Sequence, residues 1–244
     1  MANRYDRQSG IVKSGELMFP IHVLGAGGIG SWTVLLLAKM GCTNITVYDD
    51  DKVEDHNVAS QFFKEGQLGQ LKIDALKENV LEQIGIEIST EENIRAEEYI
   101  EDGLVVIAID SMEGRIKLGE IYKDKPIHII DARMGGLVME LYNCKAKNYL
   151  ATTVPPESVD TDSCTEKSIC FNCAVIGGFV ANHVRRYAKN DFSFGGELIY
   201  CFNTQTLLKK PFSPTGIVHS GTIGVASAAV SEFEGIVGAS SSDD

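Results

Sequence analysis

The chain has 244 residues, of which 44% are hydrophobic and 23% charged, and its formal net charge is −12. This length suits one α/β domain with a full-sized core, and the composition is ordinary for a globular protein. The negative charge argues against nucleic acid as the main partner.

The sequence contains no recognisable membrane or export segment. No apolar run approaches the ~20 residues that a membrane-spanning helix needs. The N-terminal residues MANRYDRQSG lack the apolar region of a secretion signal. Without such a signal, the six cysteines are expected to be reduced thiols rather than a disulfide framework. We therefore expect a cytoplasmic protein with no membrane partner.

The first half of the chain alternates between predicted strands and helices. Residues 20–41, PIHVLGAGGIGSWTVLLLAKMG, predict a buried strand, a glycine turn and an apolar helix that ends at Gly41. The further strands are predicted at 44–51, 86–90, 104–110 and 127–131, and the further helices at 66–84 and 113–123. LVVIAID, residues 104–110, is a continuous apolar run, which is typical of a fully buried parallel strand. The alternation predicts an α/β fold with a Rossmann-like, mainly parallel sheet and helices on both faces.

The second half predicts an antiparallel C-terminal extension. Residues 136–144 are interpreted as an antiparallel strand, 145–163 as a loop, 164–190 as a long, mostly buried helix and 197–210 as a strand pair. We expect one domain over residues 1–211. Residues 212–244 form a tail rich in Gly, Ser and Ala, whose end is expected to be disordered.

A nucleotide site is predicted at the first strand-to-helix turn. Gly25, Gly27 and Gly30 form G-x-G-x-x-G, and Gly28 lies in the same loop. Glycines let the backbone approach a phosphate, which the helix N-terminus then binds. Asp49 ends the next strand, where an acid can accept hydrogen bonds from ribose hydroxyls. These residues alone fit NAD as well as ATP, and a purely structural glycine turn is the third interpretation.

Six segments in order carry a resemblance to a known family. They are RYDRQ (4–8), GAGGIGS (25–31), DDDKVEDHNVASQ (49–61), QLGQLKIDAL (67–76), IDSMEGR (109–115) and ARMGG (132–136). Together they resemble the ThiF/MoeB family, the adenylating enzymes related to ubiquitin-activating enzymes. The resemblance covers roughly residues 4–136. It implies ATP-dependent adenylation of the C-terminal glycine of a ubiquitin-like or sulfur-carrier protein that ends in Gly-Gly.

The resemblance also implies roles for individual residues. Lys72 would hold the phosphates, Asp110 would bind Mg²⁺, and Arg7 would reach the phosphates from the other subunit of a homodimer. The remaining nucleotide-binding positions in the matched segments are Arg4, Asp51, Asn57 and Gln61, with Asn57 bonding ribose or phosphate oxygens. Adenylation needs such cations and a divalent metal, because the enzyme positions the reactants and stabilises charge.

Structural alternatives stay open for several of these residues. Lys72 could be a solvated helix charge, Asp110 an N-cap of the next helix, and Arg115 the partner of a structural ion pair. One departure concerns Ser60, which occupies the position where the family usually has an arginine before Gln61. The chain therefore lacks one positive charge that normally contacts the triphosphate.

The cysteines carry two further expectations. Many relatives bind structural zinc through two C-x-x-C pairs, whereas this chain has one pair, Cys170 and Cys173. We expect both to be buried in the helix over 164–190 and to react slowly, and we expect no zinc. Cys164 resembles the thioester cysteine of ubiquitin-activating enzymes and is a candidate nucleophile; the alternative is a capping or loop cysteine.

Three alternative functions fit the sequence. The same site could adenylate another peptide or a tRNA-linked carboxylate, although the acidic charge disfavours tRNA. An NAD-dependent oxidoreductase would explain the glycine loop but would leave Asn57 and Lys72 unexplained. A non-catalytic binding subunit is suggested by Ser60.

Overall fold

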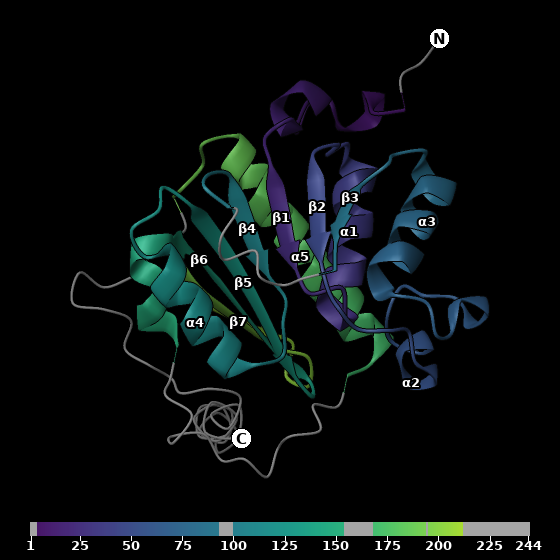
Figure 1. The fold of residues 1–244 in the computed structure, drawn as a ribbon. Coiled ribbons are helices and arrows are strands. Elements are labelled where there is room, and N and C mark those ends of the chain that lie inside the picture. The colour runs from purple at the N-terminus through teal and green to yellow at the C-terminus, as the bar shows by residue number, and fades with distance from the viewer. Residues whose placement is uncertain (1–3, 93–99, 154–167, 194, 212–244) are drawn as a thin grey trace, which may run out of the picture.

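The computed structural model describes residues 4–92, 100–153, 168–193 and 195–211. Within these residues one sheet has the strand order β3-β2-β1-β4-β5-β6-β7-β8 (Figure 1). The strands are β1 (Ile21–Leu24), β2 (Ile45–Tyr48), β3 (Ser89–Glu91), β4 (Leu104–Ile107), β5 (His128–Gly135), β6 (Val138–Lys145), β7 (Gly196–Cys201) and β8 (Thr206–Pro211). The strands from β3 to β5 in this order pair in parallel, whereas β6, β7 and β8 are added antiparallel. The predicted Rossmann-like sheet with an antiparallel extension is confirmed.

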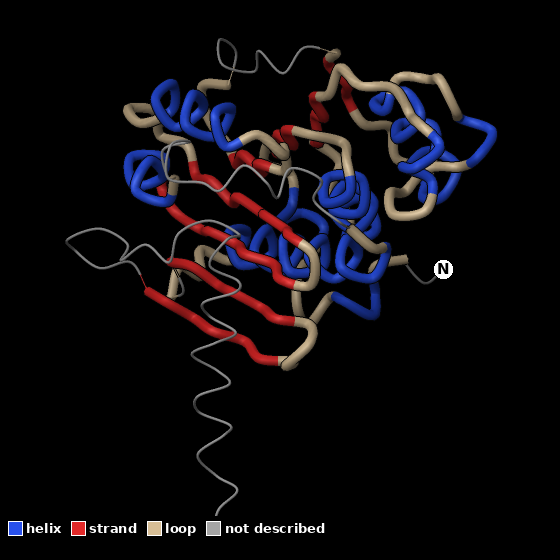
Figure 2. Tube along the Cα trace, turned by 90° about the horizontal axis from the view of Figure 1, so that it is seen from below, coloured by secondary structure: helices blue, strands red, loops and turns tan. Residues whose placement is uncertain are grey.

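Helices cover both faces of the sheet, as predicted (Figure 2). The α-helices are α1 (Gly28–Met40), α2 (Asp55–Val58), α3 (Lys72–Ile84), α4 (Met112–Tyr122) and α5 (Cys170–Ala188). Short 3₁₀ helices are η1 (Asp6–Gln8), η2 (Ser14–Leu17), η3 (Glu65–Gln67) and η4 (Ala146–Thr152). One face buries a core against α1, α3 and α5, and the other buries a smaller core against α4 and η4.

The buried run of β4 shows why the central strands are continuously apolar. Leu104 and Val106 pack in the core under α1 and α5, whereas Val105 and Ile107 pack in the core under α4. All four side chains are 0% exposed. Successive side chains of a strand point to opposite faces, so a strand that is covered on both faces needs apolar residues at every position.

Helices α1 and α5 pack side by side on one face of the sheet, with their backbones close together. A Cβ added at Gly177 of α5 would lie 3.1 Å from the backbone nitrogen of Thr33 and 3.2 Å from the backbone carbonyl carbon of Trp32. Only glycine lets the two helices approach this closely without a shift of the backbone. The beginning of α1, which follows the glycine turn, is thereby fixed against the sheet and its neighbouring helix.

Three predicted elements differ from the structure. The helix predicted at 66–84 begins only at Lys72, because Gly69 adopts a left-handed φ of +82° and the N–H of Gly69 donates to Val53 O at 2.9 Å. The predicted loop at 145–163 begins as η4. The helix predicted at 164–190 begins at Cys170. Residues 154–167 and the predicted tail at 212–244 lie outside the described residues.

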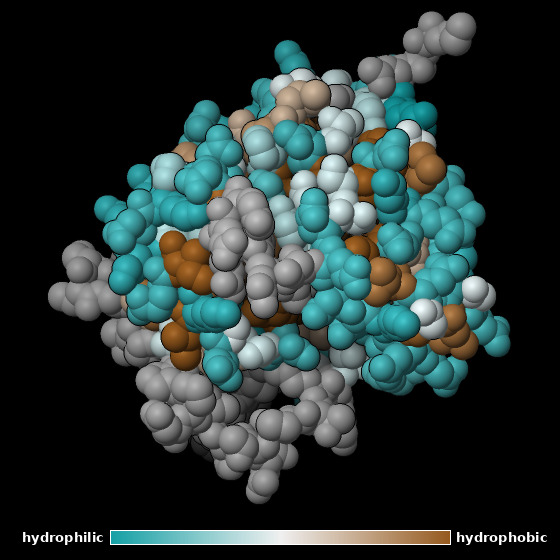
Figure 3. Space-filling view, in the orientation of Figure 1, coloured by the Kyte–Doolittle hydropathy of each residue, from teal (hydrophilic) through white to brown (hydrophobic). Residues whose placement is uncertain are grey.

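The described surface on the side of α4 is mainly hydrophilic, with small separate hydrophobic areas (Figure 3). Among the helices of the described residues, none combines the length and the apolar character that crossing a membrane requires.

Candidate functional site

The predicted nucleotide residues gather at the point where the strand order reverses. β1 pairs in parallel with β2 on one side and with β4 on the other. The glycine turn follows β1, Asp49 follows β2, and Asp110 lies three residues after the end of β4. In open α/β sheets, ligands bind at the carboxyl ends of the strands at such a switch point. The fold therefore brings three separate sequence segments to one edge of the sheet.

Two glycines of the turn are required by close backbone approach. Gly25 has a φ of +98°, and a Cβ added there would lie 2.6 Å from the carbonyl oxygen of Ala108. A Cβ on Gly30 would lie 1.8 Å from the carbonyl oxygen of Gly25. Both distances are far below van der Waals contact, so the turn cannot form with side chains at these positions.

Gly27 and Gly28 face different surroundings. Gly27 is the N-cap of α1 and provides no side-chain cap, and a Cβ added there would meet nothing within 4 Å. A Cβ on Gly28 would lie 3.1 Å from the Sγ of Cys173 in α5. The uncapped first turn of α1 presents N–H groups and the positive end of the helix dipole, which is a ready anion site. The open side at Gly27 is where a phosphate can approach.

Asp49 holds this turn together through both carboxylate oxygens. Its Oδ2 accepts the N–H of Ala26 at 2.6 Å, and its Oδ1 accepts the N–H of Asp51 at 2.9 Å. Burial raises the pKa of the Asp49 carboxyl, against the lowering effects of the Ala26 N–H, Lys72 and the Asp51 N–H. Both carboxylate oxygens of Asp49 thus accept backbone N–H groups. The predicted bond from Asp49 to ribose would use the remaining lone pairs of these oxygens.

Lys72 lies at this edge of the sheet as the first residue of α3. Its side chain is only 9% exposed, and its Nζ lies 2.6 Å from the Oδ2 of Asp51, whose side chain is 67% exposed. The N–H of Lys72 also donates to the Asp51 carbonyl at 2.9 Å. The alternative of a solvated helix charge is therefore wrong. The ammonium group is held beside the glycine turn by a partner that solvent reaches.

Carboxylates that could hold a cation flank the same turn. The carboxylate oxygens of Asp49, Asp50 and Asp51 lie within 4.8 Å of one another. Among the described residues, this is the group of three His, Cys, Asp or Glu side chains whose ligand atoms are close enough to share a metal ion. Asp110 is exposed beyond β4. Carboxylate oxygens are the ligands that Mg²⁺ prefers, so these donors fit the expected ion. Asp50 is missing from the sequence prediction, although the DDD run after β2 contains the pattern that could have found it.

The alternative role of Asp110 as a helix cap is wrong. The N-cap of α4 is Ser111, whose Oγ accepts the N–H of Gly114 at 3.1 Å. Asp110 precedes the cap and is exposed, so its carboxylate is not needed to begin the helix.

The segment from Asn57 to Gln61 is docked on the first turn of α1. Ser31 Oγ accepts the N–H of Phe62 at 3.0 Å, and Trp32 Nε1 donates to the carbonyl of Ser60 at 2.9 Å. Ser60 is 8% exposed. The position that usually carries an arginine is thus buried against the beginning of α1.

Of the two predicted ligands in this segment, Asn57 is buried and Gln61 is partly buried. Asn57 is 4% exposed, and its Oδ1 accepts the N–H of Glu54 at 2.9 Å, which caps α2. The Oε1 of Gln61 is buried and makes no hydrogen bond to any described residue. Asn57 therefore shapes the local backbone, and the amide of Gln61 retains an unused acceptor.

Arg4 and Arg7 lie at the opposite end of the molecule. Arg4 donates to the carbonyl of Ile84 at the end of α3, and Gln8 Nε2 donates to the carbonyl of Met40 at the end of α1, at 2.6 Å. Thirteen residues of α1 span about 18 Å at a rise of about 1.5 Å per residue. Arg4 and Arg7 are exposed, and the structure does not bring them to the glycine turn of their own chain.

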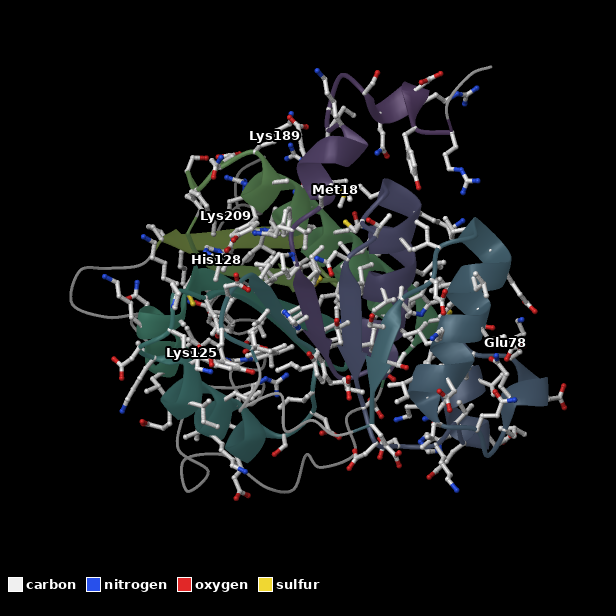
Figure 4. The ribbon with its side chains drawn as sticks, turned by 45° about the horizontal axis from the view of Figure 1, so that its top comes forward. Met18, Glu78, Lys125, His128, Lys189 and Lys209 are labelled. Atoms are coloured by element: carbon white, nitrogen blue, oxygen red, sulfur yellow. The ribbon has the colours of Figure 1, made fainter. Side chains whose placement is uncertain are left out.

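The same end of the molecule joins the N-terminal segment to α5. Figure 4 labels Met18 and Lys189 there, and Lys189 Nζ lies 2.7 Å from the Glu16 carboxylate. These contacts fix the N-terminal segment away from the carboxyl ends of the parallel strands.

Arg115 belongs to a buried cluster in which two arginines bind Asp131. Its Nε donates to Asp131 Oδ1 at 3.2 Å, and Arg133 Nε donates to Asp131 Oδ2 at 2.7 Å. Arg133 also bonds the carbonyl and hydroxyl oxygens of Thr152 at the end of η4. Despite burial, the two guanidinium groups lower the pKa of Asp131. The structural alternative for Arg115 is the one that the contacts support.

The cysteines are arranged differently from the prediction. Cys173 is buried, but Cys170 is exposed and is the first residue of α5. The expectation that both are buried within a continuous helix is wrong for Cys170, because the helix begins six residues later than predicted. Cys164 lies outside the described residues.

Comparisons with known proteins agree with this architecture. The model of the ThiF family matches residues 17–210. The ubiquitin-like modifier-activating enzyme 5 of Gallus gallus is 24% identical over 217 residues, which cover 75% of this chain and 54% of that protein. The NEDD8-activating enzyme E1 catalytic subunit of Arabidopsis thaliana is 34% identical over 101 residues, which cover 39% of this chain and 22% of that protein. The chain thus spans about half the length of the first of these relatives, and less of the second.

Among solved structures, E. coli MccB with ATP has a TM-score of 0.73 at 18% identity, covering 88% of this chain and 74% of that chain. E. coli MccB with AMPCPP and MccA also has a TM-score of 0.73, at 19% identity, covering 89% of this chain and 74% of that chain. At these identities the likeness concerns the fold. Since the family model covers most of the sequence, the chain belongs to the ThiF family.

Proposed function

We propose that this chain uses ATP and Mg²⁺ to adenylate the C-terminal carboxylate of a peptide chain, within an adenylation domain over residues 1–211. The substrate class that we favour is a ubiquitin-like or sulfur-carrier protein ending in Gly-Gly. The observation that carries the proposal is the convergence at one sheet edge of the uncapped α1 N-terminus, the Lys72–Asp51 pair and the exposed Asp110.

The cation at this edge favours a triphosphate over NAD. The phosphates of ATP carry more charge than the diphosphate of NAD, and they need a counter-charge beyond a helix dipole. Lys72 provides it, and its partner Asp51 lies where solvent and a nucleotide can reach. The carboxylates after β2 and β4 supply oxygen ligands for the metal ion that normally accompanies ATP.

In the proposed reaction a substrate carboxylate oxygen attacks the α-phosphorus of ATP, the bond to the bridging oxygen breaks, and pyrophosphate leaves. The first turn of α1 and Lys72 bind and orient the phosphates, which is the main task in phosphoryl chemistry. Asp110 would hold Mg²⁺, which when bound neutralises charge on the leaving pyrophosphate. Gly27 keeps the path to the helix N-terminus open.

The proposal includes a homodimer with shared sites. Arg7 is exposed at the end of the molecule where α1 and α3 end, about 18 Å from the first turn of α1 along the helix axis. It can contribute to a nucleotide site only if a second copy provides it. A two-fold dimer would supply two such contacts at once.

The choice of a protein carboxylate draws on the relatives. Two of them are named as activating enzymes for ubiquitin-like modifiers or NEDD8, and MccB has been solved with MccA. Cys164 remains our candidate for accepting the carboxyl group as a thioester after adenylation. Transfer onto a thiol would split a difficult acyl transfer into two easier steps.

The experiment is exchange of labelled pyrophosphate into ATP, with a panel of added carboxylates. The panel contains ubiquitin-like and sulfur-carrier proteins ending in Gly-Gly, the same proteins without their last glycine, short synthetic peptides and bulk tRNA. We expect exchange only with a Gly-Gly protein, and we expect Asp110→Asn to abolish it. Ser111→Ala is the matched control, because it removes the cap of α4 but leaves the carboxylate of Asp110.

The other outcomes distinguish the alternatives. Exchange with short peptides alone would mean that the chain adenylates peptides rather than Gly-Gly proteins. Exchange with tRNA alone would mean that it adenylates a tRNA-linked carboxylate. Exchange retained within a few fold in Asp110→Asn would mean that another carboxylate holds the metal. A chain that binds ATP but never exchanges pyrophosphate with any member would support a non-catalytic subunit.

A further inference from the structure

The two cysteines of the C-x-x-C pair, Cys170 and Cys173, differ in their exposure to solvent. Cys170 is exposed at the first residue of α5, and Cys173 is buried one turn later. The first turn is regular, since the N–H of Cys173 donates to the carbonyl of Ile169 at 3.3 Å. In a regular helix, residues three apart have Cα atoms about 5 Å from each other. Disulfides form across Cα separations of about 4.4–6.8 Å, so these two cysteines can be bridged without moving the backbone of α5.

The buried sulfur also touches the nucleotide turn. The Sγ of Cys173 lies 3.1 Å from the position that a Cβ on Gly28 would occupy. Gly28 is the first residue of α1, whose uncapped N-terminus is the proposed phosphate site. The other described cysteines, Cys42, Cys144 and Cys201, are buried on other elements. Cys173 is therefore a direct mechanical link between the exposed thiol of Cys170 and the proposed phosphate site.

We propose that Cys170 and Cys173 form a redox-active dithiol that closes to a disulfide on reaction with a peroxide, and that closure weakens nucleotide binding at the adjoining turn. The second part of this inference rests on the proposed function, and the first part does not. A C-x-x-C whose first cysteine is exposed in the first turn of a helix is the arrangement that dithiol redox centres use. A structural zinc site takes four ligands, and this pair provides two.

The two thiols have separate roles in the reaction. The Cys170 sulfur attacks one oxygen of the peroxide, the O–O bond breaks, and a sulfenic acid forms as hydroxide or alkoxide leaves and takes up the thiol proton. The Cys173 sulfur then attacks the sulfenic sulfur, the S–O bond breaks, and water leaves with the proton of Cys173. The thiols lose two electrons and two protons, and the peroxide is reduced. Burial raises the pKa of the Cys173 thiol to about 11, which suits it to act second, after Cys170 has reacted.

Closure has a structural consequence at Gly28. We expect the disulfide to turn the Cys173 sulfur toward Cys170 at the surface and so away from Gly28, which it now lies against. The turn then loses the contact that packs it against α5, in a core where such changes in packing are felt. We expect the affinity for ATP·Mg²⁺ to fall by about tenfold in the oxidised protein, on the scale of a repacked core contact.

The test begins with a chemical readout that does not involve ATP. The full chain is treated with hydrogen peroxide, alkylated with iodoacetamide and digested with trypsin. Cleavage after Lys167 and Arg185 gives a peptide of residues 168–185 that contains both cysteines, whereas Cys164 falls in the preceding peptide. We expect the 168–185 peptide to appear unalkylated and about 2 Da lighter, from the loss of two hydrogens on disulfide formation. Cys170→Ser should abolish this species.

Three outcomes would overturn the dithiol. A cross-link between the 168–185 peptide and the peptide containing Cys164 would assign the partner of Cys170 to Cys164. Stoichiometric zinc in the native mass spectrum, with both thiols protected from peroxide, would make the pair a metal site. Sulfinic acid on Cys170 with Cys173 still alkylated would show that the two sulfurs do not meet.

The second readout is calorimetric titration of ATP·Mg²⁺ into reduced and peroxide-treated protein. We expect the oxidised wild type to bind about tenfold more weakly and to recover with dithiothreitol, whereas Cys170→Ser should bind equally before and after peroxide. Unchanged affinity in a protein with a verified disulfide would overturn the coupling to Gly28. No ATP binding by the reduced wild type would refute the proposed function and leave the mass-spectrometric result on the dithiol standing.

Discussion

The Nζ of Lys72 lies 2.6 Å from the Oδ2 of Asp51, so the cation expected to bind phosphates is already held at the carboxyl edge of the sheet. A hydrogen bond to a charged group contributes about 1.5–3 kcal/mol. Lys72→Ala should therefore weaken ATP binding by about 10- to 100-fold, as measured by calorimetric titration. The fold should survive, because the carboxylate of Asp51 is 67% exposed and water can solvate it when the ammonium group is removed.

Lys77→Ala is the control for this prediction. Lys77 lies on the same helix and pairs with Glu87 at 3.2 Å, so its removal costs the chain the same charge. Equal weakening of ATP binding by both variants would mean that Lys72 acts only through the overall charge of the protein.

Substitutions at two glycines of the turn should separate a structural role, at Gly30, from a ligand-binding role, at Gly27. Gly30→Ala should destabilise the protein by at least about 1–3 kcal/mol, because its Cβ would lie 1.8 Å from the Gly25 carbonyl oxygen. Gly27→Ala should destabilise the protein less than Gly30→Ala, since nothing lies within 4 Å of the added Cβ, although its ψ of −148° lies at the edge of the extended region. It should nevertheless weaken ATP binding, because the methyl group would occupy the path to the helix N-terminus.

Thermal melts and ATP titrations of these two variants check the prediction. A Gly27→Ala protein that binds ATP like the wild type would place the phosphates elsewhere. A Gly30→Ala protein with an unchanged melting temperature would contradict the geometry of the turn.

The proposed shared site predicts complementation between two inactive variants. Arg7→Ala and Lys72→Ala should each lose pyrophosphate exchange. In an equal mixture of randomly paired chains, half of the dimers combine both variants and each has one intact site, so about a quarter of all sites should recover. The exchange assay is run on this mixture and on heterodimers purified from it by two different tags, in which about half of the sites should recover. No recovery in these heterodimers would refute the contribution of Arg7 in trans.

The buried carboxyl of Glu140 predicts a pH dependence of stability. Burial raises its pKa to about 7, with Arg133 opposing and Glu197 adding to the rise. The folded protein therefore binds a proton that the unfolded chain releases above its ordinary pKa of 4.5. The contribution of Glu140 to the free energy of unfolding should therefore fall by about 1–3 kcal/mol as the pH rises from roughly 4.5 to 7. The buried His183, whose pKa burial lowers to about 4, acts in the opposite direction over this range, so the effect of Glu140 is the difference between the wild type and a Glu140 variant.

Urea unfolding at pH 5 and pH 7.5 measures this effect. Glu140→Gln should remove this contribution and gain stability relative to the wild type as the pH rises, because the amide keeps the shape of the protonated carboxyl and its contact with Tyr142. Glu113→Gln on the exposed side of α4 is the control and should behave like the wild type. The same pH dependence in the wild type and in Glu140→Gln would mean that Glu140 is ionised in the fold.

The sequence predicts the parallel half of the sheet well because its determinants are local. The apolar run of β4 and the glycines after β1 specify a buried strand and a turn without reference to distant residues. The edge where Asp49, Lys72 and Asp110 gather follows from the same alternation, since parallel strands end on one side.

What the sequence does not predict depends on contacts between distant segments. The late beginning of α3 follows from pairing of residues 51–53 with 69–72, which periodicity does not report. The buried pairing of Arg115 with Asp131 and the docking of Arg4 at the end of α3 are likewise long-range. The exposure of Cys170 depends on where α5 begins, and an apolar helical pattern does not mark that residue.

The most direct test of the account is a paired titration of the wild-type chain with ATP·Mg²⁺ and with NAD. The site combines a helix N-terminus, a held ammonium group and carboxylates for a metal ion, which together suit a triphosphate–metal complex. We predict saturable binding of ATP that weakens when Mg²⁺ is removed, and no measurable binding of NAD at the same concentrations. NAD binding more tightly than ATP would contradict a site suited to a triphosphate–metal complex.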